Sequence, residues 1–207
     1  MASTGRSGRA QMEAASIVAA IDQACARHGA DPARVVIAGL SAGASMAALL
    51  ALHYPQRVRA VAMHSGVAPG AARSAAGALS AMQGRRHPTP LPFGAPALPP
   101  LLVIQGSADL VVNPRGGRVA AQWWADAAGA VATAPRRVQR GARRAATVTD
   151  FKSGPSVAAT LCEVDGLGHA WSGGAAGRPY GDPKGPDAAR MIWAFAARCF
   201  RQSAAKQ

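Results

Sequence analysis

A serine flanked by glycines forms the clearest chemical motif of the sequence. The segment GLSAG at residues 39–43 follows an apolar run at 35–38 and precedes a stretch rich in Ala and Leu. A G-x-S-x-G motif between a strand and a helix is typical of a nucleophile elbow, a sharp turn that exposes the hydroxyl of Ser41. Gly39 and Gly43 would let the strand and the helix approach each other. The alternative is a glycine-rich turn in which Ser41 only caps the helix.

The start of the helix after Ser41 could stabilise negative charge. The first N–H groups of a helix have no partner within it and carry the positive end of its dipole. The Ala42 N–H is therefore a candidate oxyanion donor. A second donor usually comes from a loop after an earlier strand, but only a polar tail and one helix are expected before Val35, so we identify no second donor.

A nucleophilic serine needs a base, and that base needs a carboxylate to orient it. His169, in GLGHAW at 166–171, follows a late strand on a glycine-flanked loop. Capping, packing or solvent contact is expected for His28, His53, His64 and His87. Asp109, in LLVIQGSADLVV at 101–112, follows an earlier strand, and its alternative role is to form an Asx turn. The chain order Ser, Asp, His is that of α/β hydrolases.

Strands and helices alternate around these residues. The alternation predicts an α/β sandwich with a mainly parallel sheet. The expected helices are 12–28, 42–53, 119–128 and one opened by Pro186 and Asp187, with Met191, Ile192, Phe195 and Cys199 on one face; the expected strands are 35–38, buried on both faces, 58–64, 101–105, 145–151 and 157–164. The Pro-rich stretch 87–100 is expected to be a loop or part of a lid.

Length and composition predict one folded unit. The 207 residues are 49% hydrophobic and 16% charged, which indicates a globular chain rather than a disordered one. We expect a polar tail at 1–10, a single catalytic domain at 11–202 and a tail at 203–207. Cys25, Cys162 and Cys199 show no metal-ligand spacing, so we expect no metal, no cofactor and no disulfide framework, although one pair could bridge in an exported protein.

The net charge of +13 raises the question of a polyanionic partner. The basic residues are mostly scattered Arg, with one cluster at Arg136, Arg137, Arg140, Arg143 and Arg144, and few aromatic residues are available to stack on bases. We therefore expect a solvated basic surface and no specific nucleic-acid partner.

No part of the sequence predicts membrane insertion. No window approaches the roughly 20 apolar residues of a membrane span, and the first ten residues have no apolar core behind their charges. As written, the chain is expected to be cytoplasmic and to lack a signal peptide; a shortened form of a secreted protein would show the same features.

Taken together, GLSAGASMAALLALHYPQRVRAVAMHSG, IQGSADLVVNPRGG and GLGHAWSGG resemble the polyhydroxybutyrate depolymerase family of esterases. The resemblance covers roughly residues 10 to 200 and implies an α/β-hydrolase fold without the N-terminal strands. It also implies hydrolysis of hydroxyalkanoate polymers or oligomers, short acyl esters or feruloyl-type esters, with Ser41, Asp109 and His169 at the catalytic positions. Trp171 would either line the substrate pocket or belong to the core. Ala44, Gln105 and Ser107 depart from the family pattern.

The sequence therefore predicts a metal-free serine esterase. The alternative is a catalytically degraded domain of the same fold that binds a polymer or polyanion. Because no strand is expected before Val35, residues 35–39 should form an edge of the sheet. An apolar edge without Lys or Pro invites pairing, so we expect the N-terminal segment to cover it, or a second copy of the chain in a symmetric dimer.

Overall fold

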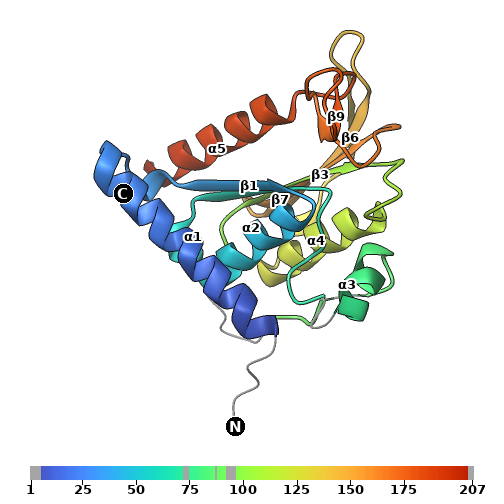
Figure 1. Ribbon diagram of the computed structural model, residues 1–207. Helices are drawn as coiled ribbons and strands as arrows, with labels where there is room; N and C mark the ends of the chain where they lie inside the picture. The colour runs from blue at the N-terminus through green and yellow to red at the C-terminus, as the bar shows by residue number, and fades with distance from the viewer. Residues whose placement is uncertain (1–5, 72–74, 87, 92–96, 205–207) are drawn as a thin grey trace.

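A seven-stranded sheet between helices forms the centre of the computed structural model, which describes residues 6–71, 75–86, 88–91 and 97–204 (Figure 1). Its strand order is β1-β2-β3-β7-β6-β4, with β5 also paired to β6. The bounds are β1 (Val36–Leu40), β2 (Ala60–His64), β3 (Leu101–Gly106), β4 (Val131–Ala132), β5 (Arg136–Val138), β6 (Ala146–Ser153) and β7 (Ser156–Val164). β1, β2, β3 and β7 run parallel, while β6 is antiparallel to β7. The predicted α/β sandwich with a mainly parallel sheet is confirmed.

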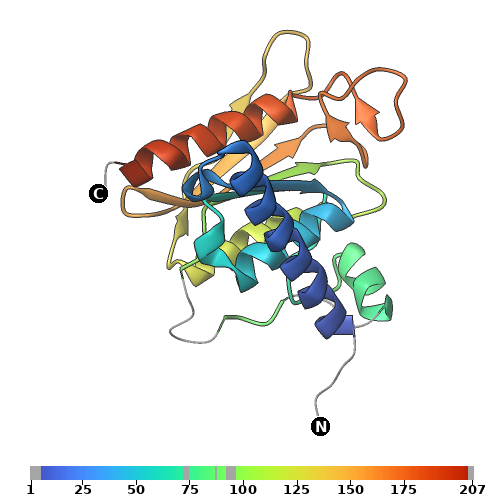
Figure 2. The same ribbon diagram turned by 60° about the vertical axis from the view of Figure 1, so that its left-hand side comes forward.

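The helices lie on both faces of the sheet. In Figures 1 and 2, α2 and α4 lie on one face, with α1 packed beside α2, and α5 crosses the opposite face. The helices are α1 (Arg6–His28), α2 (Ala42–His53), α3 (Ala75–Met82), α4 (Arg115–Ala127) and α5 (Ala188–Ala204), with short 3₁₀ turns η1 (Pro32–Arg34) and η2 (Pro55–Arg57). None of the helices in the described part of the chain has the length and apolar character that a bilayer span requires.

Alternate side chains of the central strands build two cores. Val61 and Met63 of β2 belong to a cluster with α2 and α4, whereas Ala60 and Ala62 belong to a cluster with α5. Strands with helices on both sides are apolar throughout, and all residues of β2 and β3 are buried. The Cys162 and Cys199 thiols are buried in the second cluster, and none of the three cysteines forms a disulfide within the described residues.

β1 is an edge of the sheet, as the sequence predicts, since within the described residues it pairs only with β2. The expectation that this strand is buried on both faces is wrong. Ala38 is exposed and the other residues of β1 are half-buried, because no further strand flanks it there. α1 packs mainly on α2, where Ala14 and Val18 are buried, and it begins at Arg6, earlier than the predicted start at residue 12.

The Pro-rich stretch is held by two tryptophans of α4. The indole N–H of Trp123 donates to the Thr89 carbonyl and that of Trp124 to the Pro99 carbonyl, each at 2.8 Å. The described parts of this stretch, 88–91 and 97–100, contain no helix or strand, in agreement with the predicted loop. His87 and residues 92–96 lie outside the described residues.

Candidate active site

Ser41 occupies a strained turn between β1 and α2. Its φ of 57° and ψ of −120° lie outside the regions that L-residues ordinarily adopt. Its N–H donates to the His64 carbonyl at 2.9 Å, which ties the turn to the end of β2. The Ser41 side chain makes no capping hydrogen bond to α2, so the alternative of a helix-capping serine is wrong. The turn leaves the hydroxyl available for chemistry, and strain of this kind often marks functional sites.

The two glycines of the motif have different roles. A Cβ on Gly39 would lie 2.3 Å from the carbonyl carbon and oxygen of Gly43, so only glycine fits where β1 meets α2. A Cβ on Gly43 would meet no atom within 4 Å. The expectation that both glycines are needed for close approach therefore holds for Gly39 only, because the approaching atoms at residue 43 are backbone.

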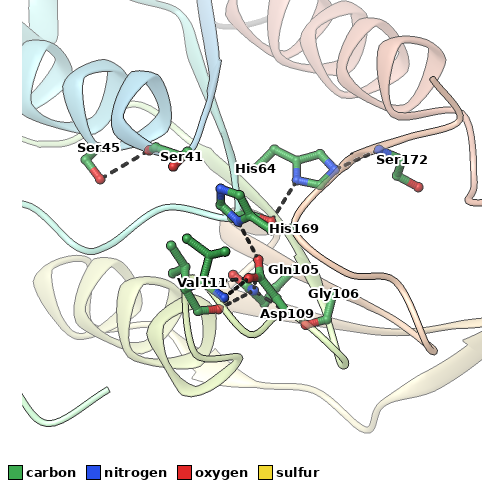
Figure 3. A network of polar contacts seen from close by, with 11 residues as sticks. Ser41, Ser45, His64, Gln105, Gly106, Asp109, Val111, His169 and Ser172 are labelled. Carbon is green, nitrogen blue, oxygen red and sulfur yellow. Dashed lines mark hydrogen bonds and ion pairs between the residues drawn. The ribbon is translucent and has the colours of Figure 1, made fainter. Parts of the chain in front are cut away.

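Asp109 lies after β3 with its side chain fully buried. Its Oδ1 accepts hydrogen bonds from the Val111 and Val112 N–H groups at 2.9 and 2.8 Å, and its Oδ2 lies 2.9 Å from Nδ1 of His169 (Figure 3). Burial alone would raise the pKa of Asp109, but the hydrogen bonds from His169 and the two amides together hold it below its ordinary value. Asp109 thus forms the Asx turn and also orients a histidine, so its two suggested roles coexist.

The loop that carries His169 packs backbone to backbone against the loop that carries Asp109. A Cβ on Gly106 would lie 2.2 Å from the Leu167 carbonyl oxygen. The Ala108 N–H donates to that carbonyl at 3.0 Å, and the Ser107 Oγ accepts from the Gly166 N–H at 2.8 Å. These contacts fix the distance between the carboxylate and the imidazole. Ser107, a departure from the family pattern, is one of the residues that join the two loops.

Ser41, Asp109 and His169 follow β1, β3 and β7, three parallel strands whose carboxyl ends lie at the same end of the sheet. Figure 3 shows the three side chains in this region. The structure joins His169 to Asp109 by a hydrogen bond. No hydrogen bond joins Ser41 Oγ to His169 among the described residues. Nucleophile–base hydrogen bonds are often long before substrate binds, so the open Ser–His contact is compatible with a triad.

Ala42 is the first residue of α2 and directly follows Ser41. The Ser41 carbonyl accepts from the Ala44 and Ser45 N–H groups at 3.1 and 3.2 Å, which starts the helix. The N–H of Ala42, at the first helical position, has no carbonyl one turn earlier within the helix to bond. It is therefore placed next to the Ser41 hydroxyl at the positive end of the helix dipole.

His64 is a functional candidate for which the sequence predicted only capping, packing or solvent contact. Its imidazole is buried, and Nε2 accepts a hydrogen bond from the Ser172 N–H at 3.0 Å, so the proton resides on Nδ1, 3.1 Å from Ser65 Oγ (Figure 3). Ser172 and Trp171 form β8 (Trp171–Ser172), which begins two residues after His169 and pairs with β9 (Gly181–Asp182). His64 thus fixes the segment that follows the candidate base. No sequence pattern indicates this contact, because His64 and Ser172 are 108 residues apart.

Trp171 lies between the core and the site. Its ring stacks on His64 with the centroids 5.3 Å apart, and it packs against the α5 side of the core. These contacts favour the core role over the pocket-wall role. The exposed aromatic residue near His169 is instead Tyr180, whose ring meets the imidazole edge to face at 6.4 Å. Leu110 and Val111, which follow Asp109 in the chain, are also exposed, so the segment after Asp109 presents apolar side chains to solvent.

Gln105 is a second residue that the sequence did not single out as functional. Its buried amide nitrogen donates to Asp109 Oδ2 at 3.3 Å and to the Val112 carbonyl at 3.2 Å. The oxygen that accepts from His169 therefore also accepts from Gln105. The Gln105 Oε1 is buried and has no hydrogen-bond partner within the described residues. The free-energy cost of this unpaired oxygen is tolerated because the amide nitrogen of the same side chain donates to Asp109.

Comparisons with known proteins place this chain in a family of esterases. Residues 3–137 match the family described as Esterase PHB depolymerase. A poly(3-hydroxyalkanoate) depolymerase C from Paucimonas lemoignei is 34% identical over 116 residues, which are 51% of this chain and 28% of that protein. The family match includes Ser41 and Asp109 but ends before His169, so the position of His169 rests on the geometry above.

Solved structures of low sequence identity share the fold. An acetyl xylan esterase from Aspergillus awamori superposes with a TM-score of 0.62 at 22% identity, over 75% of this chain and 61% of that one. SOBER1 from Arabidopsis thaliana superposes with a TM-score of 0.50 at 19% identity, over 93% and 63%. The chain spans less than two thirds of the length of each of these relatives, and the fold it shares with them is that of the α/β hydrolases.

Proposed function

Because the chain belongs to the PHB depolymerase family of esterases, we propose that it hydrolyses carboxylic esters through Ser41, His169 and Asp109. The observation that carries the proposal is the 2.9 Å contact between Asp109 Oδ2 and His169 Nδ1. It leaves Nε2 of His169 as the nitrogen that can receive a proton. A buried carboxylate bonded to one imidazole nitrogen is the arrangement that makes the other nitrogen a general base.

In the proposed reaction, Ser41 Oγ attacks the ester carbonyl carbon while His169 Nε2 takes its proton. The tetrahedral oxyanion accepts a hydrogen bond from the Ala42 N–H. The C–O bond to the alcohol then breaks, His169 returns the proton to the leaving oxygen, and an acyl-enzyme remains. Water repeats the two steps and releases the carboxylic acid. Asp109 stays ionised throughout and stabilises the imidazolium, in keeping with its lowered pKa.

The proposed substrates are esters with apolar acyl chains, either hydroxyalkanoate oligomers and polymers or short acyl esters. Leu110, Val111 and Tyr180 support this substrate class, because they expose apolar surface beside the dyad, and exposed apolar patches mark binding surfaces. The relative from Paucimonas lemoignei is named for poly(3-hydroxyalkanoate).

The test is turnover of p-nitrophenyl butyrate. Ser41→Ala and His169→Ala should each remove nearly all activity. Asp109→Asn should leave a small remainder, on the order of 10⁴-fold below the wild type, because the amide selects the wrong imidazole tautomer. Ser16→Ala, a change on exposed α1, is the control and should retain full turnover.

Two outcomes would contradict the proposal. Wild-type turnover by Ser41→Ala would remove the elbow from the mechanism. A wild-type protein no faster than the Ser41→Ala variant would show that turnover has been lost, and the alternative of a degraded domain that binds a polymer would then replace the esterase.

A further inference from the structure

A cavity of about 510 Å³ lies on the α5 side of the sheet, and neither Ser41, Asp109 nor His169 lines it. Its walls come from α5 and from β5, β6 and the segment between them, which rises beside the start of α5 (Figure 2). We call it the arginine cavity. Its volume falls within the range of small-molecule sites, roughly 300–1,000 Å³.

The floor of the arginine cavity is apolar. Leu102, Val148, Cys162 and Phe195 line it and are buried. Burial raises the pKa of the Cys162 thiol to about 12, so this sulfur carries no charge at neutral pH. The floor therefore offers a surface against which an alkyl chain can lose its contact with water.

The rim of the cavity is positively charged. Asp187 is the only acidic residue among the described residues that line it, and its carboxylate already accepts from the Arg190 N–H at the start of α5 at 3.0 Å. Six of the described arginines also line the cavity: Arg136, Arg140, Arg143, Arg144, Arg190 and Arg198.

These arginines divide by whether they already have a partner. Arg136 pairs with Asp150 at 2.6 Å and Arg144 with Asp182 at 2.9 Å. Arg143 donates to the Gly185 carbonyl at 2.6 Å, and Arg198 lies over the Phe195 ring. Within the described part of the chain, the guanidinium groups of Arg140 and Arg190 make no hydrogen bond or ion pair. Two exposed cations thus stand unpaired at the mouth of a cavity with an apolar floor.

We propose that the arginine cavity binds an anionic amphiphile, a single carboxylate or phosphate head group on a medium-length apolar chain. Arg140 and Arg190 hold the head group, since a guanidinium matches the oxygens of carboxylate and phosphate, and the chain lies on the floor formed by Leu102, Val148 and Phe195. A nucleic acid fits less well, because Arg136 and Arg144 are already neutralised by acids and the binding surface is concave and apolar.

The test is calorimetric titration of the whole protein with ligands that separate head group from chain. Octanoate and octyl phosphate should bind, and their relative affinities identify the preferred head group. Octanol, octylammonium and inorganic phosphate should each bind at least about tenfold more weakly, because each lacks the charge or the chain. Ser41→Ala should bind octanoate as the wild type does, so loss of the proposed esterase function would leave this test intact.

Variants locate the site. Arg140→Gln and Arg190→Gln should each weaken octanoate binding about tenfold or more. Arg201→Gln, on the same helix but outside the cavity lining, is the matched control and should bind normally. Ala194→Trp changes an exposed residue that lines the cavity and should block the chain while every arginine remains.

The proposal would be overturned by octanol binding as tightly as octanoate, by equal losses in Arg190→Gln and Arg201→Gln, or by undiminished octanoate binding in Ala194→Trp. A duplex DNA that binds more tightly than octanoate and depends on the same arginines would replace it with a polyanion surface.

Discussion

A neutral imidazole at His64 holds the segment after the candidate base. Its Nε2 can accept from the Ser172 N–H only while unprotonated. Burial lowers the pKa of His64 to about 4, the neighbouring Asp109 acts in the opposite direction, and His169 lowers it further. The residue that looks like simple packing in the sequence is therefore coupled to Ser172 by its protonation state.

This coupling predicts a pH-dependent stability. Since the folded pKa lies below the ordinary value of 6.5, the unfolded chain takes up the proton first as the pH falls. The contribution of His64 to the free energy of unfolding is complete above about pH 6.5. As the pH falls from about 6.5 to 4, the free energy of unfolding decreases by on the order of 3 kcal/mol. Urea unfolding at a series of pH values measures it.

The control for this prediction is His64→Gln, which can still accept from Ser172 but does not titrate. Its free energy of unfolding should vary less than that of the wild type between pH 6.5 and 4. Identical pH profiles for the two proteins would show that His64 is not the titrating group.

At the scale of the elements, β1 and α2 can meet closely only because Gly39 has no side chain. Gly39→Ala would press a Cβ against the Gly43 backbone and should destabilise the protein by about 2–3 kcal/mol, as overpacking does, with loss of esterase turnover. Gly43→Ala is the matched control, because its Cβ meets nothing and alanine favours a helix by up to about 1 kcal/mol. Thermal unfolding and turnover measure both. Equal effects of the two variants would contradict this account of the elbow.

Elements with strong local signals could be predicted from the sequence. The Ala-rich helix is found at Ala42–His53, as predicted, because it contains no Pro and small side chains suit its buried position. α3, β4, β5, β8 and β9 were not predicted. The four strands have two or three residues each, too few to show the alternation of apolar and polar residues by which a strand is recognised.

Some residues of the candidate site could be predicted from the sequence and others could not. The order of Ser41, Asp109 and His169 and the strands before them are visible in the sequence. Because parallel strands have their carboxyl ends at the same end of the sheet, these three residues were expected to lie close together. Gln105 and His64 could not, since their roles depend on which backbone groups lie opposite them. Their residue types alone predict only a buried polar group.

At the scale of the whole molecule, β1 presents an open edge. Ala38 is exposed and Ile37 half-buried, and this apolar edge has none of the Lys or Pro residues that discourage pairing. We predict a symmetric dimer through β1 that light scattering detects at micromolar concentration. Hydrogen exchange should find the amides of 35–39 protected.

Ala38→Lys should convert this dimer to a monomer without loss of fold, because the side chain points to solvent. A wild-type protein that is strictly monomeric, with rapid exchange at 35–39, would contradict the prediction.

The parallel sheet also has a kinetic consequence. The contact between Asp109 and His169 joins residues 60 apart in sequence, and that between His64 and Ser172 joins residues 108 apart. Such long loops must close before their contacts offer any stabilisation, so these contacts form late. During refolding from urea, helical circular dichroism should therefore recover before ester turnover does. Recovery of both signals in one phase would mean that these long-range contacts form together with the helices. A lag in turnover would mean that the candidate active site is the last part of the chain to assemble.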